Sequence, residues 1–372
     1  MSMTRREMLQ ALGLLAAATT VSPRMALSET MPHAPGGGLV KSDAHCHVVD
    51  FIQGSEGLKS LIDHMDQAGV AHCQIMGLPV TKKWDRIDRK PPTYYLDNDS
   101  RVYFYGSTDV DVARAYQALP ASKRRRLHPF LCGFNPTDQY AINHVRRMFD
   151  WFPDVWQGIG EIMLRHDDLT ALTLGETATA DHPALDPIYA FAARRNLPVQ
   201  IHSNVGNKRL SEPVYLYEVG NALTRHPATT IILAHAGVSR SFAIPTIAAD
   251  IRGLMTRHPN LWIDLSWVVY EECVAPGGHV DARWVDLAEA FPRRVMIGTD
   301  MIGHWSDYAA TIGKYDPFLA KLRPETAVGV ASRNFLDLVG AKKRAPAVTE
   351  PGTEAVPAQQ RLSLLSSDVV EA

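Results

Sequence analysis

Strand-like and helix-like stretches alternate eight times along the chain after residue 38. Each strand-like run is short and apolar, and is rich in β-branched residues or bounded by Gly and Pro. The runs are LVKSDAHCH, HCQIMGL, HPFLCGF, VWQGIGEI, LPVQIHS, TTIILAHAG, LWIDLSWV and RVMIGTD. Between them, stretches such as 56–69, 141–152 and 185–196 repeat apolar residues at three- and four-residue spacing, as amphipathic helices do. Eight alternating units predict an α/β fold, a closed parallel (β/α)8 TIM barrel.

Polar side chains follow several of these runs at the point where each strand is expected to end. They are His45, His47, Glu161, His202, His235 and Asp300. Catalytic residues of a (β/α)8 barrel sit at the C-terminal ends of its strands, so six at corresponding places indicate a functional site. One such residue by itself, for example His202, would more simply be a buried histidine of the core whose ring is hydrogen-bonded. Asp43, His45 and His47 alternate along one strand, and we expect the deeper Asp43 to orient one of the histidines.

Further polar or aromatic residues follow the later strands and are candidates for the walls of a pocket. They are Arg165, His166, Trp267, Glu271, His304 and Trp305. Aromatic side chains would form an apolar wall, and Arg165 would receive an anionic group of a substrate. Each is equally compatible with an ordinary loop residue, so none is assigned a catalytic role.

The motifs resemble, in matching order, the amidohydrolase-related branch of the amidohydrolase superfamily. They are DAHCH, GIGE, LPVQIHS, IILAHAG, IDLSW and IGTD, followed by ASRNFLDLVG, and the resemblance spans roughly residues 40–340. It implies a barrel that binds one or two divalent metal ions, most often zinc. By position it implies the ligands His45, His47, His202 and Asp300, with His235 binding a second metal or assisting the chemistry.

The ligand types agree with this expectation. Imidazoles and carboxylates suit Zn²⁺, and a catalytic zinc keeps one position open for a water whose pKa it lowers to about 7. Asp300 is then placed to accept the proton of that water and His235 to polarise the substrate carbonyl. Glu161 departs from the family pattern, in which several members carry a carboxylated lysine after strand four. A carboxylate can also bridge two ions, so Glu161 as a metal ligand in a one-metal or a two-metal centre stays open.

These residues predict a metal-dependent hydrolase that uses metal-activated water on a small carbonyl substrate, an amide, a lactone or another ester. The resemblance implies an alternative, because relatives of this branch include non-hydrolytic decarboxylases that use the same metal on an aromatic or dienoic carboxylate. A third interpretation is a catalytically silent barrel that binds a ligand. The presence of all the catalytic-type residues argues against this third interpretation, since a site that has lost its catalytic activity would not need them.

The N-terminal segment 1–28 is predicted to be a twin-arginine signal peptide, because Arg5 and Arg6 precede a short apolar run. That run is shorter than a membrane-spanning helix requires, so we expect a periplasmic or extracellular protein without a stable membrane anchor after cleavage. The remaining divisions are a linker at 29–39, the barrel at 40–340 and a tail at 341–372. The tail is rich in Pro, Ala, Glu and Gln and is expected to lack stable structure.

Composition narrows the range of partners. A net charge of −2, with 46% hydrophobic and 21% charged residues, is ordinary for a soluble enzyme and offers no electrostatic case for nucleic acid. We therefore expect a small-molecule substrate, while assembly into a homo-oligomer stays open. The four cysteines show no CxxC spacing and predict no disulfide framework. The region 82–126 is longer than one helix needs and is expected to form an excursion over the mouth of the barrel.

Overall fold

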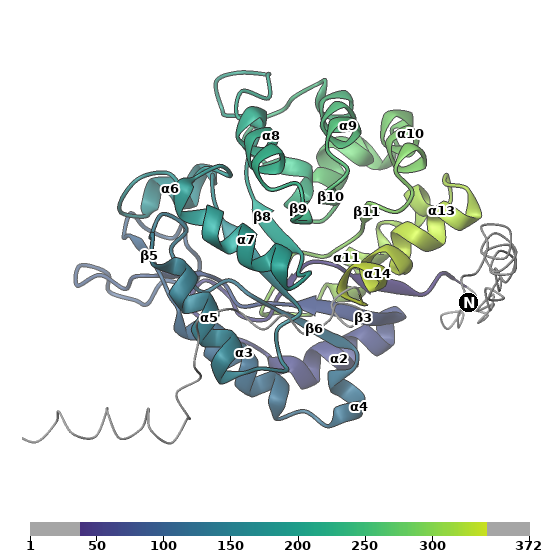
Figure 1. Cartoon of the computed structure of the whole chain (residues 1–372). Coiled ribbons are helices and arrows are strands. Elements are labelled where there is room, and N and C mark those ends of the chain that lie inside the picture. The colour runs from purple at the N-terminus through teal and green to yellow at the C-terminus, as the bar shows by residue number, and fades with distance from the viewer. Residues whose placement is uncertain (1–37, 341–372) are drawn as a thin grey trace, which may run out of the picture. The chain divides into compact units, whose positions relative to one another are not determined.

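The computed structural model describes residues 38–340, which fold around one curved sheet of eight parallel strands (Figure 1). The strands lie side by side in chain order. They are β1 (Lys41–Asp43), β3 (Val70–Ile75), β6 (Leu127–Leu131), β7 (Gly158–Met163), β8 (Val199–His202), β9 (Ile231–Leu233), β10 (Leu261–Asp264) and β11 (Val295–Met296). Each overlaps the run predicted for it, so all eight predicted strands are confirmed.

The first and last strands meet and close the sheet into a barrel. The backbone N–H of Ala44 donates to the carbonyl oxygen of Ile297 at 3.0 Å, and that of Asp300 donates to His45 at 2.7 Å. Beyond them, the short strands β2 (Cys46–His47) and β12 (Met301–Ile302) pair in parallel. The predicted (β/α)8 barrel is therefore confirmed, and its closing seam joins the segments that carry two histidines and an aspartate of the predicted site.

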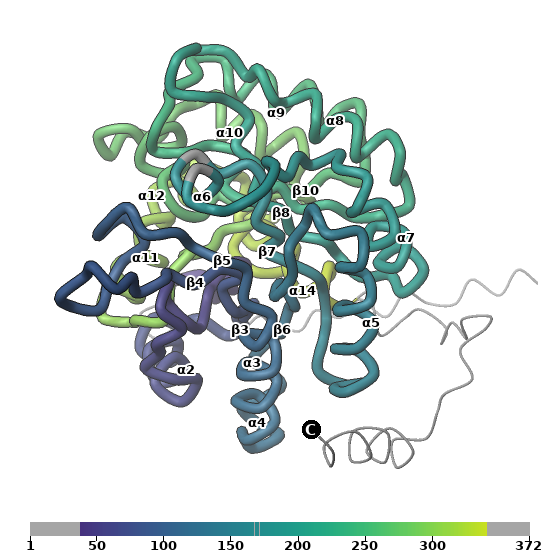
Figure 2. Tube along the Cα trace, turned by 90° about the vertical axis from the view of Figure 1, so that its left-hand side faces the viewer, coloured from purple at the N-terminus to yellow at the C-terminus, as the bar shows by residue number. Residues whose placement is uncertain are grey.

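Helices cover the outside of the barrel, as Figures 1 and 2 show. Those that connect successive strands are α2 (Gly57–Ala68), α3 (Ser107–Gln117), α4 (Ala121–Arg124), α5 (Ala141–Trp151), α6 (Asp167–Leu172), α7 (Asp186–Arg194), α8 (Leu216–Arg225), α9 (Ile247–Arg257) and α10 (Ala282–Ala290). Those after β12 are α11 (Tyr308–Gly313), α12 (Asp316–Leu319), α13 (Pro324–Val328) and α14 (Asn334–Gly340). Within residues 38–340, no helix combines the length and the apolarity needed to cross a membrane.

The apolar spacing of each helix places one face against the sheet. In α2 the buried residues Leu58, Leu61, Ile62 and Met65 share one face of the helix, which ends at Ala68 and is capped by Gly69. Gly69 has a φ of 68°, a left-handed conformation that glycine adopts without steric cost at a helix C-terminus. The sequence thus determines both the buried face of this helix and its last residue.

About half of the predicted 82–126 excursion belongs to the barrel, because α3 and α4 lie within it. The part that leaves the barrel is a hairpin in which β4 (Val80–Lys82) and β5 (Val102–Phe104) pair antiparallel. The buried ammonium group of Lys82 donates to the carbonyl oxygens of Asn98 and Ser100, at 2.8 and 2.5 Å, and fixes the long connection between the strands. That connection carries two tyrosines to the mouth of the barrel.

The predictions for segments 1–28 and 341–372 concern residues outside those that the structure describes, as does the greater part of the predicted linker at 29–39.

Candidate metal centre and active site

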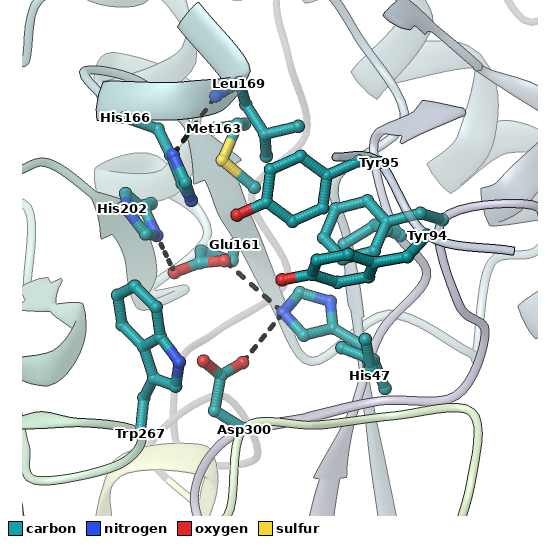
Figure 3. Close-up of a pocket in the computed structure, with 13 residues that line it drawn as sticks. His47, Tyr94, Tyr95, Glu161, Met163, His166, Leu169, His202, Trp267 and Asp300 are labelled. Carbon is teal, nitrogen blue, oxygen red and sulfur yellow. Dashed lines mark hydrogen bonds and ion pairs between the residues drawn. The ribbon is translucent and has the colours of Figure 1, made fainter. Parts of the chain in front are cut away.

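Six polar side chains meet inside the barrel at the C-terminal ends of the strands. They are the predicted site residues His45, His47, Glu161, His202, His235 and Asp300. They form three overlapping triplets, and within each triplet the atoms able to bind a metal lie within 4.8 Å of one another. Figure 3 shows His47, Glu161, His202 and Asp300 pointing toward one another at the base of a pocket. The structure therefore brings together all six side chains that the strand ends predicted.

Hydrogen bonds behind the rings determine which nitrogens of His45 and His47 face the centre. Nδ1 of His47 lies 2.7 Å from the carbonyl oxygen of Gly77, which can only accept, so this Nδ1 carries the proton. Nδ1 of His45 faces the carboxylate of Asp264 at 3.3 Å. Both rings therefore direct Nε2 inward, as metal-binding histidines do when a carbonyl or a carboxylate holds the other nitrogen.

The inward-facing atoms form a set that attracts positive charge. The two Nε2 atoms lie 3.3 Å apart, and Oδ1 of Asp300 lies 3.2 Å from that of His45 and 3.4 Å from that of His47. Burial disfavours a charged imidazole, yet Asp300 and Glu161 raise the pKa of His47 to about 9. The same carboxylates and Asp264 raise the pKa of His45 well above its ordinary value. A buried group of imidazoles and carboxylates of this kind fits a divalent cation.

Glu161 connects the two sides of the centre. Its Oε2 lies 3.3 Å from Nε2 of His47, whereas its Oε1 lies 3.1 Å from Nδ1 of His202 and 3.4 Å from Nε2 of His235. Burial opposes ionisation of this carboxyl, but His202 and His45 hold its pKa well below the ordinary value. An ionised carboxylate whose two oxygens face different histidines is in a position to bind one ion or to bridge two.

Three buried imidazole nitrogens at the centre have no hydrogen-bond partner among residues 38–340. They are Nε2 of His202 and both ring nitrogens of His235. Buried polar atoms are nearly always hydrogen-bonded, and leaving one unpaired costs about 1–3 kcal/mol. Burial also lowers the pKa of His235, so its ring is neutral at pH 7 and keeps a lone pair. The unpaired ring of His235 is therefore the clearest sign that the centre takes a ligand, whereas His202 faces Glu161 through its Nδ1.

Left-handed backbone conformations aim several side chains into the site. His235, Trp267 and Asp300 have φ values of 43°, 54° and 54°. Non-glycine residues in this region cost about 1–3 kcal/mol each and cluster at functional sites. The backbone N–H of His235 is held by Oδ1 of Asp264 at 3.1 Å, and that of Asp300 by the carbonyl of His45. Tertiary hydrogen bonds thus maintain the two conformations that place predicted site residues.

Asp264 supports the centre from β10, although the sequence analysis did not assign it a role. Its Oδ2 faces Nδ1 of His45 and accepts a hydrogen bond from Nε2 of Gln200 at 2.9 Å. Burial would raise its pKa, but His45 lowers it, so the carboxylate stays ionised.

Asp43 does not orient a histidine ring, so that expectation was wrong. Its carboxylate accepts from the backbone N–H of His45 at 3.1 Å and from the backbone N–H and Oγ1 of Thr299, at 2.9 and 2.7 Å. The two-residue alternation fails here because the chain leaves the strand at Ala44, between β1 and β2. Asp43 instead ties the first strand to the segment that precedes Asp300.

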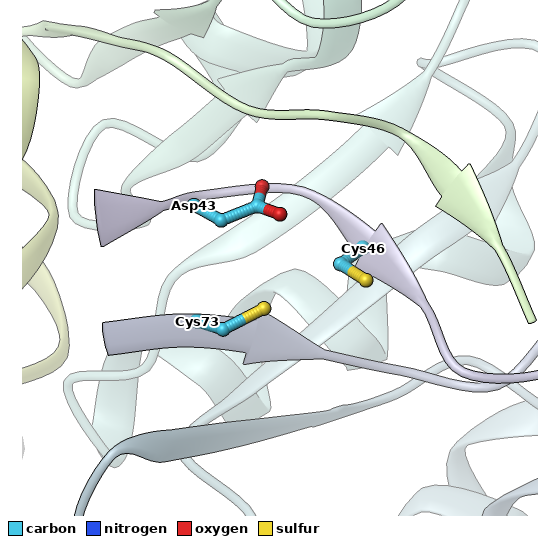
Figure 4. Close-up of side chains that lie close together, drawn as sticks. All are labelled: Asp43, Cys46 and Cys73. Atoms are coloured by element: carbon cyan, nitrogen blue, oxygen red, sulfur yellow. The ribbon is translucent and has the colours of Figure 1, made fainter. Parts of the chain in front are cut away.

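Asp43 also belongs to a second cluster, with Cys46 and Cys73, that could hold a metal by distance alone (Figure 4). Burial raises the pKa of both thiols and, against the hydrogen bonds from Thr299, raises that of Asp43 to about 6. The carboxylate is already occupied by donors from His45 and Thr299. We therefore interpret this cluster as packing between the first strands, with the cysteines acting as small apolar side chains.

A pocket of about 90 Å³ opens onto the centre, with His47, Glu161, His202 and Asp300 at its base. Its walls are mostly apolar or aromatic. They include Phe51, Tyr94, Tyr95, Met163, His166 and Trp267. No lysine or arginine is among the described residues that line it. The pocket therefore suits a small substrate with a flat apolar part.

Arg240 fastens the hairpin connection at the rim of this pocket. Its guanidinium donates to the hydroxyl of Tyr95 at 2.6 Å, to that of Tyr94 at 3.3 Å and to the carboxylate of Asp168 at 3.2 Å. It also lies 6.0 Å from the ring of Trp267. Neither the tyrosines nor Arg240 were singled out from the sequence, because only the folded hairpin brings them together.

The candidate wall residues divide between pocket and surface. His166 and Trp267 line the pocket. The guanidinium of Arg165 donates to both carboxylate oxygens of Glu218. It is therefore not directed at a substrate anion, as had been expected. His304 is exposed and faces Asp50 at 3.3 Å, away from the pocket lining.

The sequence comparison identifies the family. The family model described as amidohydrolase matches residues 42–334, which is most of the chain. The chain therefore belongs to the amidohydrolase family, whose members are metal-dependent enzymes, and the predicted resemblance is confirmed. A search of curated proteins found no sequence match.

Solved structures support the fold. A probable 2-pyrone-4,6-dicarboxylic acid hydrolase from Acinetobacter baumannii, solved with citric acid bound, is 14% identical, with 81% of this chain and 100% of that one covered and a TM-score of 0.50. A putative amidohydrolase from Staphylococcus aureus is 14% identical over 81% and 99% of the two chains, with a TM-score of 0.50. A TIM-barrel protein from Bordetella bronchiseptica is 16% identical over 77% and 84%, again with a TM-score of 0.50. At these identities the likeness concerns the barrel alone.

Proposed function

We propose that the protein is a metal-dependent hydrolase of a small carbonyl compound, an amide, a lactone or another ester. The observation that carries the proposal is the convergence of four imidazoles and two carboxylates at the base of one pocket. A bound divalent metal, when present in such a site, polarises a carbonyl and makes water nucleophilic at neutral pH. Membership of the amidohydrolase family supports this class of chemistry.

Zinc is the metal we propose, with His45, His47 and Asp300 as ligands of one ion. The ligand set consists of nitrogen and carboxylate oxygen atoms, which zinc prefers. Glu161, His202 and His235 form a second triplet, so these residues would be able to hold a second ion. The unpartnered nitrogens of the second triplet support its participation in metal or substrate binding.

The two oxygens of Asp300 are differently placed, which suggests separate tasks. Oδ1 lies close to the Nε2 atoms of His45 and His47, whereas Oδ2 lies 3.7 Å from Nε2 of His235. Burial opposes ionisation, but the histidines hold the pKa of Asp300 well below its ordinary value. We infer that Oδ1 would help to hold a bound metal and that Oδ2 accepts the proton of the attacking water and passes it to the leaving group.

His235 is proposed to act on the substrate carbonyl in the one-metal form of the site. Its neutral ring carries one N–H, which can donate to the carbonyl oxygen on which negative charge develops. Its Nε2 lies 3.7 Å from Oδ2 of Asp300, so a carbonyl held by His235 would lie next to the proposed proton acceptor.

The proposal is tested by following oxygen from labelled water. Zinc-loaded protein is incubated in ¹⁸O-water with aryl esters, aromatic lactones, anilides and aromatic carboxylic acids, and the products are analysed by mass spectrometry. We expect one labelled oxygen in the acid product of an ester, lactone or amide. Carbon dioxide release from a carboxylic acid without labelled product would replace the hydrolase by a decarboxylase. Saturable thermal stabilisation by ligands without turnover of any compound would favour a silent binding barrel.

Export to the periplasm is proposed from Arg5 and Arg6, which precede the apolar run near the N-terminus. Changing both arginines to lysine keeps the charge but alters the pair that the twin-arginine machinery reads. We expect the full chain to accumulate in the cytoplasm, as measured by cell fractionation. The matched control changes Arg24 to lysine and should leave export unaffected; unchanged periplasmic recovery of the double variant would refute this route.

A further inference from the structure

His166 is a buried pocket residue to which the proposed mechanism gives no task. It follows β7, is 6% exposed, and lines the pocket beside Tyr95 and Trp267. Its ring stacks on that of His202, with 4.5 Å between the ring centroids and 23° between the planes. The imidazole therefore forms part of the wall immediately next to the candidate metal centre.

A hydrogen bond on the far side of the ring fixes its tautomer. His166 is the residue before α6, and its Nδ1 accepts from the backbone N–H of Leu169 at 3.3 Å, which caps the first turn. A backbone N–H can only donate, so Nδ1 must hold the lone pair and Nε2 must carry the proton. Figure 3 shows this bond running from the ring toward Leu169, away from the carboxylates at the base of the pocket.

The Nε2–H group is then left pointing at the pocket with nothing to donate to. The structure records no hydrogen bond for it within the described part of the chain, although the ring is almost fully buried. The neighbouring tyrosine hydroxyls already accept from the guanidinium of Arg240. An oriented donor that opens into the pocket and has no acceptor among residues 38–340 is available to a ligand.

We propose that Nε2–H of His166 binds the substrate directly, by donating to an sp² oxygen held beside the metal centre. This rests on the proposed function and specifies its substrate class: a compact, flat molecule with a carbonyl or carboxylate oxygen within one or two bonds of the reacting carbon. The stacking on His202 sets that short spacing, because the donor and the candidate ligand belong to adjacent rings. The aromatic walls accommodate the rest of the molecule.

Benzoate is a suitable probe, because it joins a flat ring to a carboxylate and its binding can be measured without turnover. Its affinity for the zinc-loaded protein is measured by isothermal titration calorimetry. His166→Phe keeps a ring able to stack on His202 but removes the donor, and is expected to weaken benzoate binding by about 10- to 100-fold, the range for a lost hydrogen bond to a charged group. The bound zinc, measured by elemental analysis, should stay unchanged.

A second variant of His166 separates its role as a hydrogen-bond donor from its role as a helix cap, and a variant of His182 serves as the control. His166→Asn retains a good capping residue but is too short to reach the pocket, so it should weaken benzoate binding like His166→Phe while keeping the wild-type melting temperature. His182→Phe is the matched control, because His182 also caps a turn through its Nδ1, at 3.2 Å from the backbone nitrogen of Ala184, but lies outside the pocket lining. It should bind benzoate like the wild type.

Nitrogen NMR of the zinc-loaded protein supplies an independent measurement, since it distinguishes the two tautomers of His166. The proposal requires the proton on Nε2 and a shift of that signal when benzoate is added. The proposal would be overturned by a proton on Nδ1 of His166. It would also be overturned if benzoate bound wild type and His166→Asn equally well, or did not bind the wild type at all. A protein that binds benzoate through His166 but incorporates no labelled water would refute the hydrolase and leave this inference intact.

Discussion

Asp300→Asn is expected to lower turnover by about 10²- to 10⁴-fold while most of the metal stays bound. The amide keeps the size of the side chain and one oxygen that can face His45 and His47, as Oδ1 does now. It cannot accept a proton at the position of Oδ2, so the shuttle between water and leaving group is lost. Turnover is measured on whichever ester or lactone the labelled-water experiment identifies, and zinc by elemental analysis.

The control for this prediction is Asp63→Asn, which changes an exposed carboxylate that pairs with Lys59 on the surface. It should leave both turnover and zinc content unchanged. Near-native turnover of Asp300→Asn with its zinc in place would show that another group moves the proton. The mechanism would then be rebuilt around His235, whose Nε2 lies 3.7 Å from Oδ2 of Asp300, or around Glu161.

The barrel and the six converging side chains could be predicted because both depend on chain order. In a closed parallel barrel every strand ends on the same face, so a polar residue at the end of an apolar run is placed without knowledge of distances. Glu161, His202 and His235 come from three separate strands, yet lie within hydrogen-bonding or ion-pairing distance of one another. Metal binding was implied by the family resemblance, and the side-chain types agree with it.

Residues that support the site were harder to predict, because their roles depend on packing between distant segments. Asp264 reaches His45 across the barrel over a sequence separation of 219 residues. Tyr94 and Tyr95 reach the pocket only because the hairpin folds over the mouth and Arg240 binds their hydroxyls. No periodic pattern in the sequence encodes these contacts, since they arise from loop conformation.

Asp43 illustrates where pattern reasoning failed outright. The two-residue period of a strand places alternating side chains on one face only while the backbone stays extended. The chain departs from the strand at Ala44, so Asp43 contacts backbone groups of His45 and Thr299, and Asp264 takes the place expected for it behind the ring. The residue type was right for a supporting carboxylate, but the strand that carries it was wrong.

His47→Ala is expected to remove metal and activity together, in contrast to Asp300→Asn. The ring supplies Nε2 to the centre and is held by the carbonyl of Gly77, and alanine leaves the carboxylates of Glu161 and Asp300 facing an empty position. Loss of a ligand should weaken zinc binding by more than the roughly 10- to 100-fold typical of groups behind a ligand. Turnover should fall below detection unless zinc is added in large excess.

Wild type and His47→Ala should also differ in how strongly bound metal stabilises the fold. This difference can be measured without knowing the substrate. Metal at 100 times its Kd stabilises a folded protein by about 2.7 kcal/mol, so a chelator should lower the melting temperature of the wild type but barely change that of the variant. His64→Ala, on α2 and outside the candidate metal centre, is the control and should respond to chelator like the wild type. A His47→Ala protein that retains full zinc and responds to chelator would mean that His47 is not needed to hold the ion, because two other triplets could hold it: His45, His235 and Asp300, or Glu161, His202 and His235. In the second case the proton-accepting role inferred for Asp300 would lose its metal partner.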